Sequence, residues 1–214
     1  HPADAGRLAA LVADPASGPV LNVRLRTDTG EYRWFDVEAR DLTANPEVGG
    51  VLLTCHEIGE RKDLQDELIH QASHDRLTGL PNRSAFTARL HDLIVDGRPQ
   101  RPLALLYLDL DGFKPVNDAL GHDAGDRVLR VVARRLPQAV RPDAVVARLG
   151  GDEFVIVLDG SGPDEATDTA DALLNAVREP ISVSSQLVHV DASIGVVTAG
   201  PGDHVPNAER LVRR

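Results

Sequence analysis

Four carboxylates in the second half of the chain have types and spacings that suit a metal ion. Asp109 and Asp111 end an apolar run that begins at Leu103, and a spacing of two puts both side chains on one face of a strand. Asp152 and Glu153 follow two glycines, which predict a tight hairpin turn. Hard carboxylate oxygens suit Mg²⁺, which commonly also binds substrate phosphates. The pattern therefore indicates metal-assisted phosphate chemistry.

The residues that follow Asp111 form a candidate phosphate site. Gly112, Phe113 and Lys114 stand at an expected helix start, where free backbone N–H groups and the helix dipole favour an anion. Taken singly, such acids and such a lysine are more often turn, cap or solvated residues. Two carboxylate pairs that face each other would, however, repel and be costly to desolvate unless a cation neutralised them. Together they favour a functional site.

A sheet and several helices are needed to position these residues, and the hydrophobic pattern predicts both. The expected elements are a helix at 84–95, a strand at 103–110, a long helix at 115–136, hairpin strands at 145–149 and 154–158, a helix at 164–178, a strand at 187–198 and a helix from 207. This order predicts a sheet covered by helices, an α+β fold.

The first part of the chain has a different pattern. Alternating apolar residues predict three antiparallel strands, a meander, at 20–25, 32–37 and 51–55. A charged helical stretch follows from Glu57 to Ala72, with leucines spaced by four, and reads as a connecting helix. A new domain is expected to start near Ser73.

Composition narrows the function classes. A formal net charge of −10 and a pI near 5.2 argue against a nucleic-acid or anionic membrane surface. No stretch approaches a membrane span, so we expect membrane contact only through regions outside this chain. The single cysteine, Cys55, excludes an intrachain disulfide, fits a cytoplasmic location, and is predicted to pack in a core. Because the chain begins with His1 and contains no methionine, we expect it to be part of a longer protein.

The hairpin letters RLGGDEF, from Arg148 to Phe154, resemble the signature of GGDEF diguanylate cyclases. Three further segments agree with that family in order and spacing: DRLTGLPNR at 75–83, the stretch from Asp109 to Asp126, and DASIGV at 191–196. The resemblance implies a mainly antiparallel central sheet flanked by helices, of the nucleotide-cyclase or palm-like kind. The meander and GERK at 59–62 are similar to the final strands and exit helix of PAS sensory domains.

The resemblance also implies roles for individual residues. Asp109 and Asp152 would hold Mg²⁺ or Mn²⁺, with the Leu110 backbone carbonyl assisting and Glu153 as a further acid. Asn117 and Asp126 match positions that recognise guanine, for which an amide and a carboxylate are suitable partners. The implied substrate-binding residues are Asn117, Asp126, Phe113, Gly150 and Gly151, and the implied catalytic residues are Asp152, Glu153 and Lys114.

The implied reaction condenses two GTP molecules into cyclic di-GMP and releases pyrophosphate. Lys114 would stabilise the phosphates, and Asp152 is the candidate for assisting hydroxyl deprotonation. Each domain of the family holds one GTP, so two domains must face each other, and a homodimer is part of catalysis. The implied organisation is the C-terminal portion of a PAS domain at 1–56, a signalling helix at 57–72 and a GGDEF domain at 73–214.

Two departures from the family pattern stand out. Members often carry a product site, Arg-x-x-Asp, before the hairpin, but the stretch from Arg141 to Ala144 places alanine at the aspartate position. This argues against feedback inhibition through that site. Family domains also continue beyond the position where this chain stops, at Arg214, so the domain is expected to be C-terminally incomplete.

Two other classes of function stay open. The first is a GGDEF module that binds GTP or regulates a neighbouring phosphodiesterase domain or partner without turnover. The second is a chain that serves chiefly as a PAS dimerisation unit. In the second case the chain would still associate after Asp109 and Asp152 are replaced.

Overall fold

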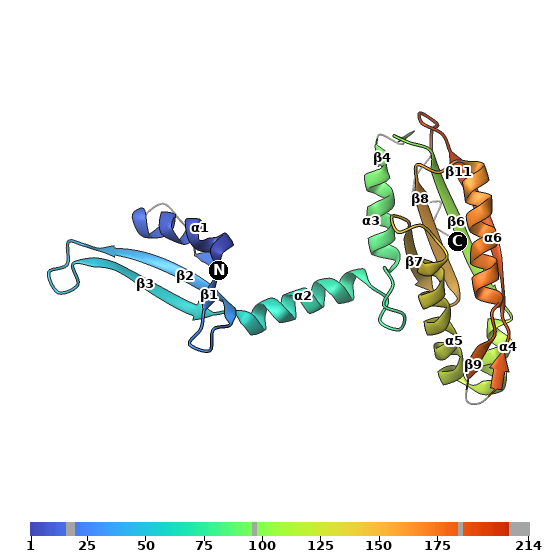
Figure 1. Ribbon diagram of the computed structural model, residues 1–214, viewed down its shortest axis with the longest axis horizontal. Coiled ribbons are helices and arrows are strands. Elements are labelled where there is room, and N and C mark those ends of the chain that lie inside the picture. Colours follow the sequence, from blue (N-terminus) through green and yellow to red (C-terminus); the bar gives the residue numbers. More distant parts are fainter. Residues whose placement is uncertain (16–19, 96–97, 184–185, 206–214) are drawn as a thin grey trace. The chain divides into compact units, whose positions relative to one another are not determined.

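The computed structural model describes residues 1–15, 20–95, 98–183 and 186–205 (Figure 1). Contacts divide the chain into two compact units, His1–Ile69 and His70–Arg214. Each unit has its own buried core. Within the described ranges, no helix is both long enough and apolar enough to cross a membrane.

A three-stranded antiparallel sheet in the order β1-β2-β3 forms most of the first unit. Its elements are helix α1 (Pro2–Ala13) and strands β1 (Leu21–Arg26), β2 (Tyr32–Leu42) and β3 (Gly50–Glu57). The strands agree with the meander expected from the sequence. Helix α1 was not predicted. It begins at His1, whose side chain accepts a hydrogen bond from the Ala3 N–H, and Pro2 occupies a first-turn position that suits its missing N–H.

The core of the first unit is small and does not include the cysteine. Leu11, Val23 and Val37 are buried together. The prediction that Cys55 packs in a core was wrong, because its side chain is exposed. Strand β3 is an edge strand, and its residues from Leu52 to Glu57 are all exposed. An apolar strand pattern does not distinguish an edge strand from a central one.

Helix α2 (Gly59–Ser73) agrees with the connecting helix expected at 57–72. Ile58, just before it, is buried and donates its N–H to the Trp34 carbonyl, so the helix begins directly from the sheet. Leu64 and Leu68, four residues apart, are each 58% exposed. The apolar stripe of this helix therefore faces solvent in the isolated chain.

The second unit contains a four-stranded antiparallel sheet in the order β11-β6-β8-β7. Its strands are β6 (Leu103–Asp111), β7 (Val145–Gly150), β8 (Glu153–Asp159) and β11 (Asp191–Ala199). Two short hairpins accompany it: β4 (Ile94–Val95) with β5 (Arg98–Pro99), and β9 (Ile181–Val183) with β10 (Gln186–Val188). The predicted α+β class with a mainly antiparallel sheet is confirmed.

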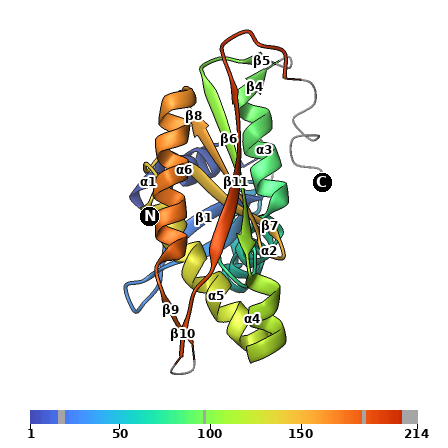
Figure 2. The same ribbon diagram turned by 90° about the vertical axis from the view of Figure 1, so that its right-hand side faces the viewer.

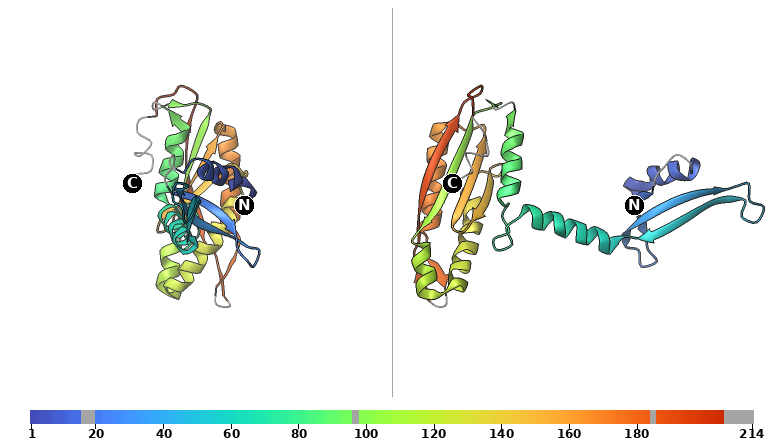
Figure 3. Two further views of the ribbon diagram at one scale, coloured as in Figure 1. Left: turned by 90° about the vertical axis from the view of Figure 1, so that its left-hand side faces the viewer. Right: turned by 180° about the vertical axis from the view of Figure 1, so that it is seen from behind.

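Helices cover both faces of this sheet (Figure 2, Figure 3). They are α3 (Arg83–Leu93), α4 (Phe113–Leu120), α5 (His122–Arg135), the short 3₁₀ helix η1 (Leu136–Gln138) and α6 (Pro163–Arg178). Alternate residues of β6 point to opposite faces. Leu105 packs with Phe86 and Leu90 of α3, whereas Leu106 packs in the cluster that includes Val128 of α5 and Leu173 of α6. Both faces of β6 are therefore buried along most of the strand. Its exposed residues are Asp109 and Asp111, at the polar end.

Two predicted elements of the second unit need correction. The long helix expected at 115–136 is two helices, because Gly121 adopts φ 85° between α4 and α5, and a residue with positive φ cannot continue a right-handed helix. The single strand expected at 187–198 is divided into β10 and β11, and β9 was missed. The helix expected from 207 lies outside the described residues.

Candidate active site

Three strands bring the predicted acids to one end of the sheet. Asp109, near the end of β6, pairs with Glu153 of β8 on one side and with Ser193 of β11 on the other. Residues directly opposite in a ladder share a face, with Cβ atoms roughly 4.5–5.5 Å apart. The Ser193 hydroxyl donates to Asp111 Oδ2 at 2.7 Å. The sheet register thus places Asp109 and Glu153 side by side.

The turn between β7 and β8 brings Asp152 to the same place. Gly150 and Gly151 have φ values of 142° and 54°, conformations that favour glycine. The Leu110 N–H donates to the Asp152 carbonyl at 3.3 Å, which ties the hairpin tip to the end of β6. Asp109, Leu110, Asp152 and Glu153, the four predicted metal residues, are therefore neighbours.

The electrostatics of this group favour a bound cation. Partial burial raises the pKa of Asp109 above its ordinary value, and the negative charges of Asp152, Glu153 and Asp111 raise it further. A divalent cation would offset this repulsion, and an all-oxygen donor set suits Mg²⁺ or Mn²⁺. In the part of the chain that the structure describes, no three such side chains already surround one point. The carboxylates would have to rotate to share an ion.

A buried arginine holds the hairpin tip. Arg148 is 9% exposed, and its Nη1 donates to Asp75 Oδ1 at 2.7 Å. Its Nε and Nη2 donate to the Gly151 carbonyl at 3.0 and 2.7 Å. A planar guanidinium can satisfy both partners at once because its donors are held in a fixed fork. One side chain therefore joins the opening loop of the unit to the turn that carries Asp152.

The opening loop is itself ordered by short-range hydrogen bonds. Asp75 Oδ1 also accepts from the Thr78 N–H and hydroxyl, at 2.9 and 2.6 Å. Asn82 caps α3 through the Ala85 N–H at 3.0 Å, and its Nδ2 donates to the Ala72 carbonyl at 2.8 Å. From the sequence this loop was identified only as a family motif. Its contact with Arg148 was missed, since pairs 73 residues apart carry no local signal.

The predicted phosphate segment begins at a left-handed glycine. Gly112 has φ 80° and precedes α4, so the chain turns sharply after the acids. Lys114 is exposed at the start of the helix, in a position to meet an anion. Phe113, in contrast, is buried in the main core. Its side chain positions the helix, and only its backbone could contact a substrate.

The two predicted guanine residues lie on adjoining helices. Asn117 is on α4 and Asp126 is on α5, and these helices pack against each other. Gly125 is buried beside them, and a Cβ there would overlap the Asn117 side-chain amide. Asp126 pairs with Arg130 at 3.6 Å on the exposed surface. The absence of a side chain at residue 125 thus makes room for the Asn117 side chain against α5.

The stretch that departs from the family's product motif is engaged inside the protein. Arg141 Nη1 donates to Glu165 Oε1 at 3.0 Å, Nε lies 3.0 Å from Asp143 Oδ1, and Nη2 donates to the Asp159 carbonyl. Arg141 therefore joins its own loop to the end of β8 and the start of α6.

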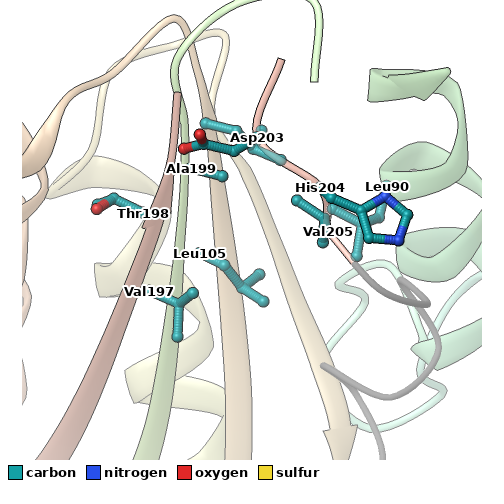
Figure 4. Close-up of a pocket in the computed structure, with 9 residues that line it drawn as sticks. Leu90, Leu105, Val197, Thr198, Ala199, Asp203, His204 and Val205 are labelled. Atoms are coloured by element: carbon teal, nitrogen blue, oxygen red, sulfur yellow. The ribbon is translucent and has the colours of Figure 1, made fainter. Parts of the chain in front are cut away.

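A separate hollow of about 420 Å³ lies on the α3 face of the sheet (Figure 4). Its walls come from α3, β6, β11 and the residues after β11: Leu90, Leu103, Leu105, Val197, Thr198, Ala199, Asp203, His204 and Val205. Leu103 and Leu105 lie at the opposite end of β6 from Asp109. The hollow is mostly apolar and does not include the acidic group, so it is not the candidate active site.

The second unit is thus an α+β domain. Acids from a strand end and from a β-hairpin lie together at one end of its sheet, and Asn117 and Asp126 lie on the helices α4 and α5. The chain belongs to the GGDEF family, because the family model described as "Diguanylate cyclase, GGDEF domain" matches residues 72–214. The acids, the hairpin glycines and the Asn117–Asp126 pair all lie within the matched range.

Known proteins share this domain with the chain. The bifunctional diguanylate cyclase/cyclic di-GMP phosphodiesterase MucR of Pseudomonas aeruginosa is 43% identical over 147 residues, which are 68% of this chain and 21% of that protein. The diguanylate cyclase TpbB of the same organism is 45% identical over 140 residues, covering 62% and 32% of the two chains. The chain thus spans between about a fifth and a third of the length of these relatives.

The fold is also shared with a solved enzyme structure. The crystal structure of the diguanylate cyclase SiaD with its activator SiaC, from Pseudomonas aeruginosa, superimposes with a TM-score of 0.62 at 32% identity. The match covers 72% of this chain and 59% of that chain. Homologues named diguanylate cyclases therefore support a cyclase function related to cyclic di-GMP.

Proposed function

We propose that this chain is the cyclase part of a diguanylate cyclase, which condenses two GTP molecules into cyclic di-GMP and two pyrophosphates. One observation carries the proposal: Asp109 at the end of β6 is paired with Glu153, and the hairpin tip brings Asp152 beside it. The negative charges of three acids so placed repel one another, and a bound cation that also binds phosphate would offset this repulsion.

We propose that Asp109, Asp152 and Glu153 hold Mg²⁺ or Mn²⁺, assisted by the Leu110 carbonyl. The bound ion would balance the negative charge that develops on the phosphates. The raised pKa of Asp109 is the observation that supports this fit. Lys114, exposed after Gly112 at the start of α4, would bind phosphate oxygens beside the helix N-terminus.

Guanine selection is assigned to the polar pair on α4 and α5. Asn117 offers an amide donor and acceptor, and Asp126 offers a carboxylate acceptor for the base N–H groups. Gly150 and Gly151 would allow the nucleotide to approach the hairpin backbone closely, because neither carries a Cβ. In this proposal the phosphates of GTP lie at the acids, and the guanine lies at helices α4 and α5.

The reaction needs two bound nucleotides. The 3′-hydroxyl of one GTP attacks the α-phosphate of the other, a new P–O bond forms, and the bond to the β-phosphate oxygen breaks with loss of pyrophosphate. Asp152 would accept the hydroxyl proton. A second, symmetrical attack closes the ring. Because the chain has one set of these residues, we propose that two copies face each other in a homodimer.

Regulation is proposed to come from the first unit. Residues 1–56, which contain α1 and the three-stranded meander, would be the C-terminal portion of a PAS domain. Residues 57–72 would be the signalling helix that leads into the GGDEF domain at 73–214. Leu64 and Leu68, both exposed on α2, support a paired helix in the dimer. The engaged Arg141 and the missing aspartate at Ala144 support the absence of product feedback at that loop.

A second candidate is a module that binds GTP without turnover and regulates a phosphodiesterase domain or another partner. The observation in its favour is that no three acids of the described residues already surround one point. This module would bind GTP through Asn117 and Asp126 but form no product. The two candidates therefore differ in turnover, not in binding.

Turnover and binding should be measured on the same preparations. The full chain, Asp152→Ala and the matched control Asp168→Ala, which removes an exposed aspartate of α6, are incubated with GTP and Mg²⁺. Cyclic di-GMP is measured by mass spectrometry and GTP affinity by calorimetry. We expect product from the chain and from Asp168→Ala but not from Asp152→Ala. GTP binding with no product from any of the three would support the second candidate.

A further inference from the structure

Tyr107 lies beside the acids without being one of the family motif residues. It stands two positions before Asp109 on β6, so both side chains are on the α3 face of the sheet. Its hydroxyl is 3.4 Å from Glu153 Oε2. Arg83 Nη2, at the start of α3, lies 3.9 Å from the same oxygen. Within the described residues, these two contacts of the Glu153 carboxylate both fall on Oε2.

We propose that Tyr107 is a positioning residue for the divalent cation: its hydroxyl holds Oε2 of Glu153 and leaves Oε1 for the metal. This inference rests on the proposed function, in which Glu153 is a metal ligand. Tyr107 itself would touch neither metal nor substrate. It would act by limiting the directions that the Glu153 side chain can adopt.

The need for such a partner follows from the sheet register. Glu153 and Asp109 are directly opposite each other, and like charges in that position repel. A glutamate has three side-chain torsions, so an unrestrained carboxylate would turn away from Asp109 toward water. A hydrogen bond to a fixed donor removes part of that freedom before the ion arrives.

Tyr107 is suited to be the fixed donor. Its ring is half-buried and packs against the cluster of Phe86, Leu90 and Val155, which holds the side chain in place. The phenol hydroxyl is the donor and the Glu153 carboxylate, which has only acceptor atoms when ionised, is the acceptor. Arg83 adds a positive charge near the same oxygen. Partners of this kind around metal ligands commonly change metal affinity by about 10- to 100-fold.

Tyr107→Phe tests the proposal because it removes the hydroxyl and keeps the ring that packs in the core. The matched control is Tyr32→Phe, at the chain's other tyrosine, which is 46% exposed in the first unit. Mn²⁺ alone is titrated into each 214-residue chain, and the free ion is followed by electron paramagnetic resonance. We expect the Mn²⁺ dissociation constant to rise about tenfold in Tyr107→Phe and to stay unchanged in Tyr32→Phe.

Two further measurements separate positioning from packing. The thermal midpoint without metal should differ by less than about 2 °C between Tyr107→Phe and the unaltered chain, whereas a packing role would lower it more. In a Glu153→Ala background, Tyr107→Phe should have no further effect on Mn²⁺ binding, because the hydroxyl acts through Glu153. An equal effect in both backgrounds would overturn the proposal.

The failure of this inference can be told apart from failure of the proposed function. Unchanged Mn²⁺ affinity in Tyr107→Phe, with tight binding by the unaltered chain, contradicts only the role of Tyr107. Absence of Mn²⁺ binding by the unaltered chain contradicts the metal site itself, and with it both proposals.

Discussion

Arg148 and Asp75 form an ion pair of 2.7 Å between Nη1 and Oδ1, across 73 positions of the chain. The same guanidinium donates to the Gly151 carbonyl, so the pair supports the turn that carries Asp152. Side-chain exposures of 9% and 24% make it a largely buried pair. The opening loop of the GGDEF domain and the hairpin that carries Asp152 are thus joined by one side chain.

Arg148→Ala should destabilise the second unit by about 3 kcal/mol, because it removes the guanidinium that pairs with the Asp75 carboxylate and donates to the Gly151 carbonyl. The measurement is urea unfolding of the full chain. Arg134→Ala, on the exposed face of α5, is the control and should change the free energy of unfolding by less than about 0.5 kcal/mol. Equal effects of the two substitutions would contradict a structural role for the Arg148 contacts.

The ion pair also predicts a pH dependence. Burial raises the pKa of Asp75, but hydrogen bonds from Thr78 and Arg148 outweigh it and leave the pKa below its ordinary value. A lowered carboxyl pKa contributes stability above the unfolded value of about 3.9, and this contribution is lost as the pH falls through the lower folded value. The stability gap between the chain and Asp75→Asn, measured by urea unfolding, should therefore narrow below about pH 4. A gap that is constant from neutral to acidic pH would contradict this account.

Gly125→Ala should weaken GTP binding by about tenfold, because a Cβ there overlaps the Asn117 amide and displaces a proposed guanine contact. Calorimetry with GTP checks this. Gly6→Ala, in α1 with nothing near its added Cβ, is the matched control and should bind GTP normally. If Gly125→Ala binds GTP as tightly as the control, Asn117 is not part of the guanine site.

Asp109→Asn should abolish product formation while slightly stabilising the metal-free chain. The charge that it removes faces Glu153 directly and lies near Asp152, and like-charge pairs across strands cost up to about 1 kcal/mol. Thermal unfolding in the presence of a chelator measures the stability, and mass spectrometry measures the product. A loss of stability together with the loss of activity would mean that Asp109 is a structural residue.

Much of the fold was predictable because the patterns were local. The apolar run from Leu103 predicts a strand, and the paired glycines at 150 and 151 predict a hairpin turn. The structure has both, as strand β6 and the turn between β7 and β8. The split of the long helix at Gly121 was missed, because a single glycine inside a helical pattern is also compatible with a continuous helix. Helix α1 was missed. It begins at the second residue of the chain, and its cap is His1, which is not one of the residues that usually cap a helix.

The site was predictable in its residue types but not in its connections. The pairing of Asp109 with Glu153 follows from strand register, which depends on the whole sheet. The role of Arg148 depends on a loop 73 residues away, and the buried side chain of Phe113 depends on packing under α4. In the sequence, Tyr107 is part of an apolar strand pattern and has no signal of its own. Its role becomes visible only in the structure, where its hydroxyl lies beside the Glu153 carboxylate.

The most direct test of the central claim is the stoichiometry of turnover. The purified full chain is incubated with GTP and Mg²⁺, and cyclic di-GMP and pyrophosphate are quantified together, with EDTA as the metal-free control. The account predicts two pyrophosphates for each cyclic di-GMP, and neither product with EDTA. GTP that is bound but returned unchanged, with no cyclic di-GMP from a demonstrably dimeric chain, would contradict it.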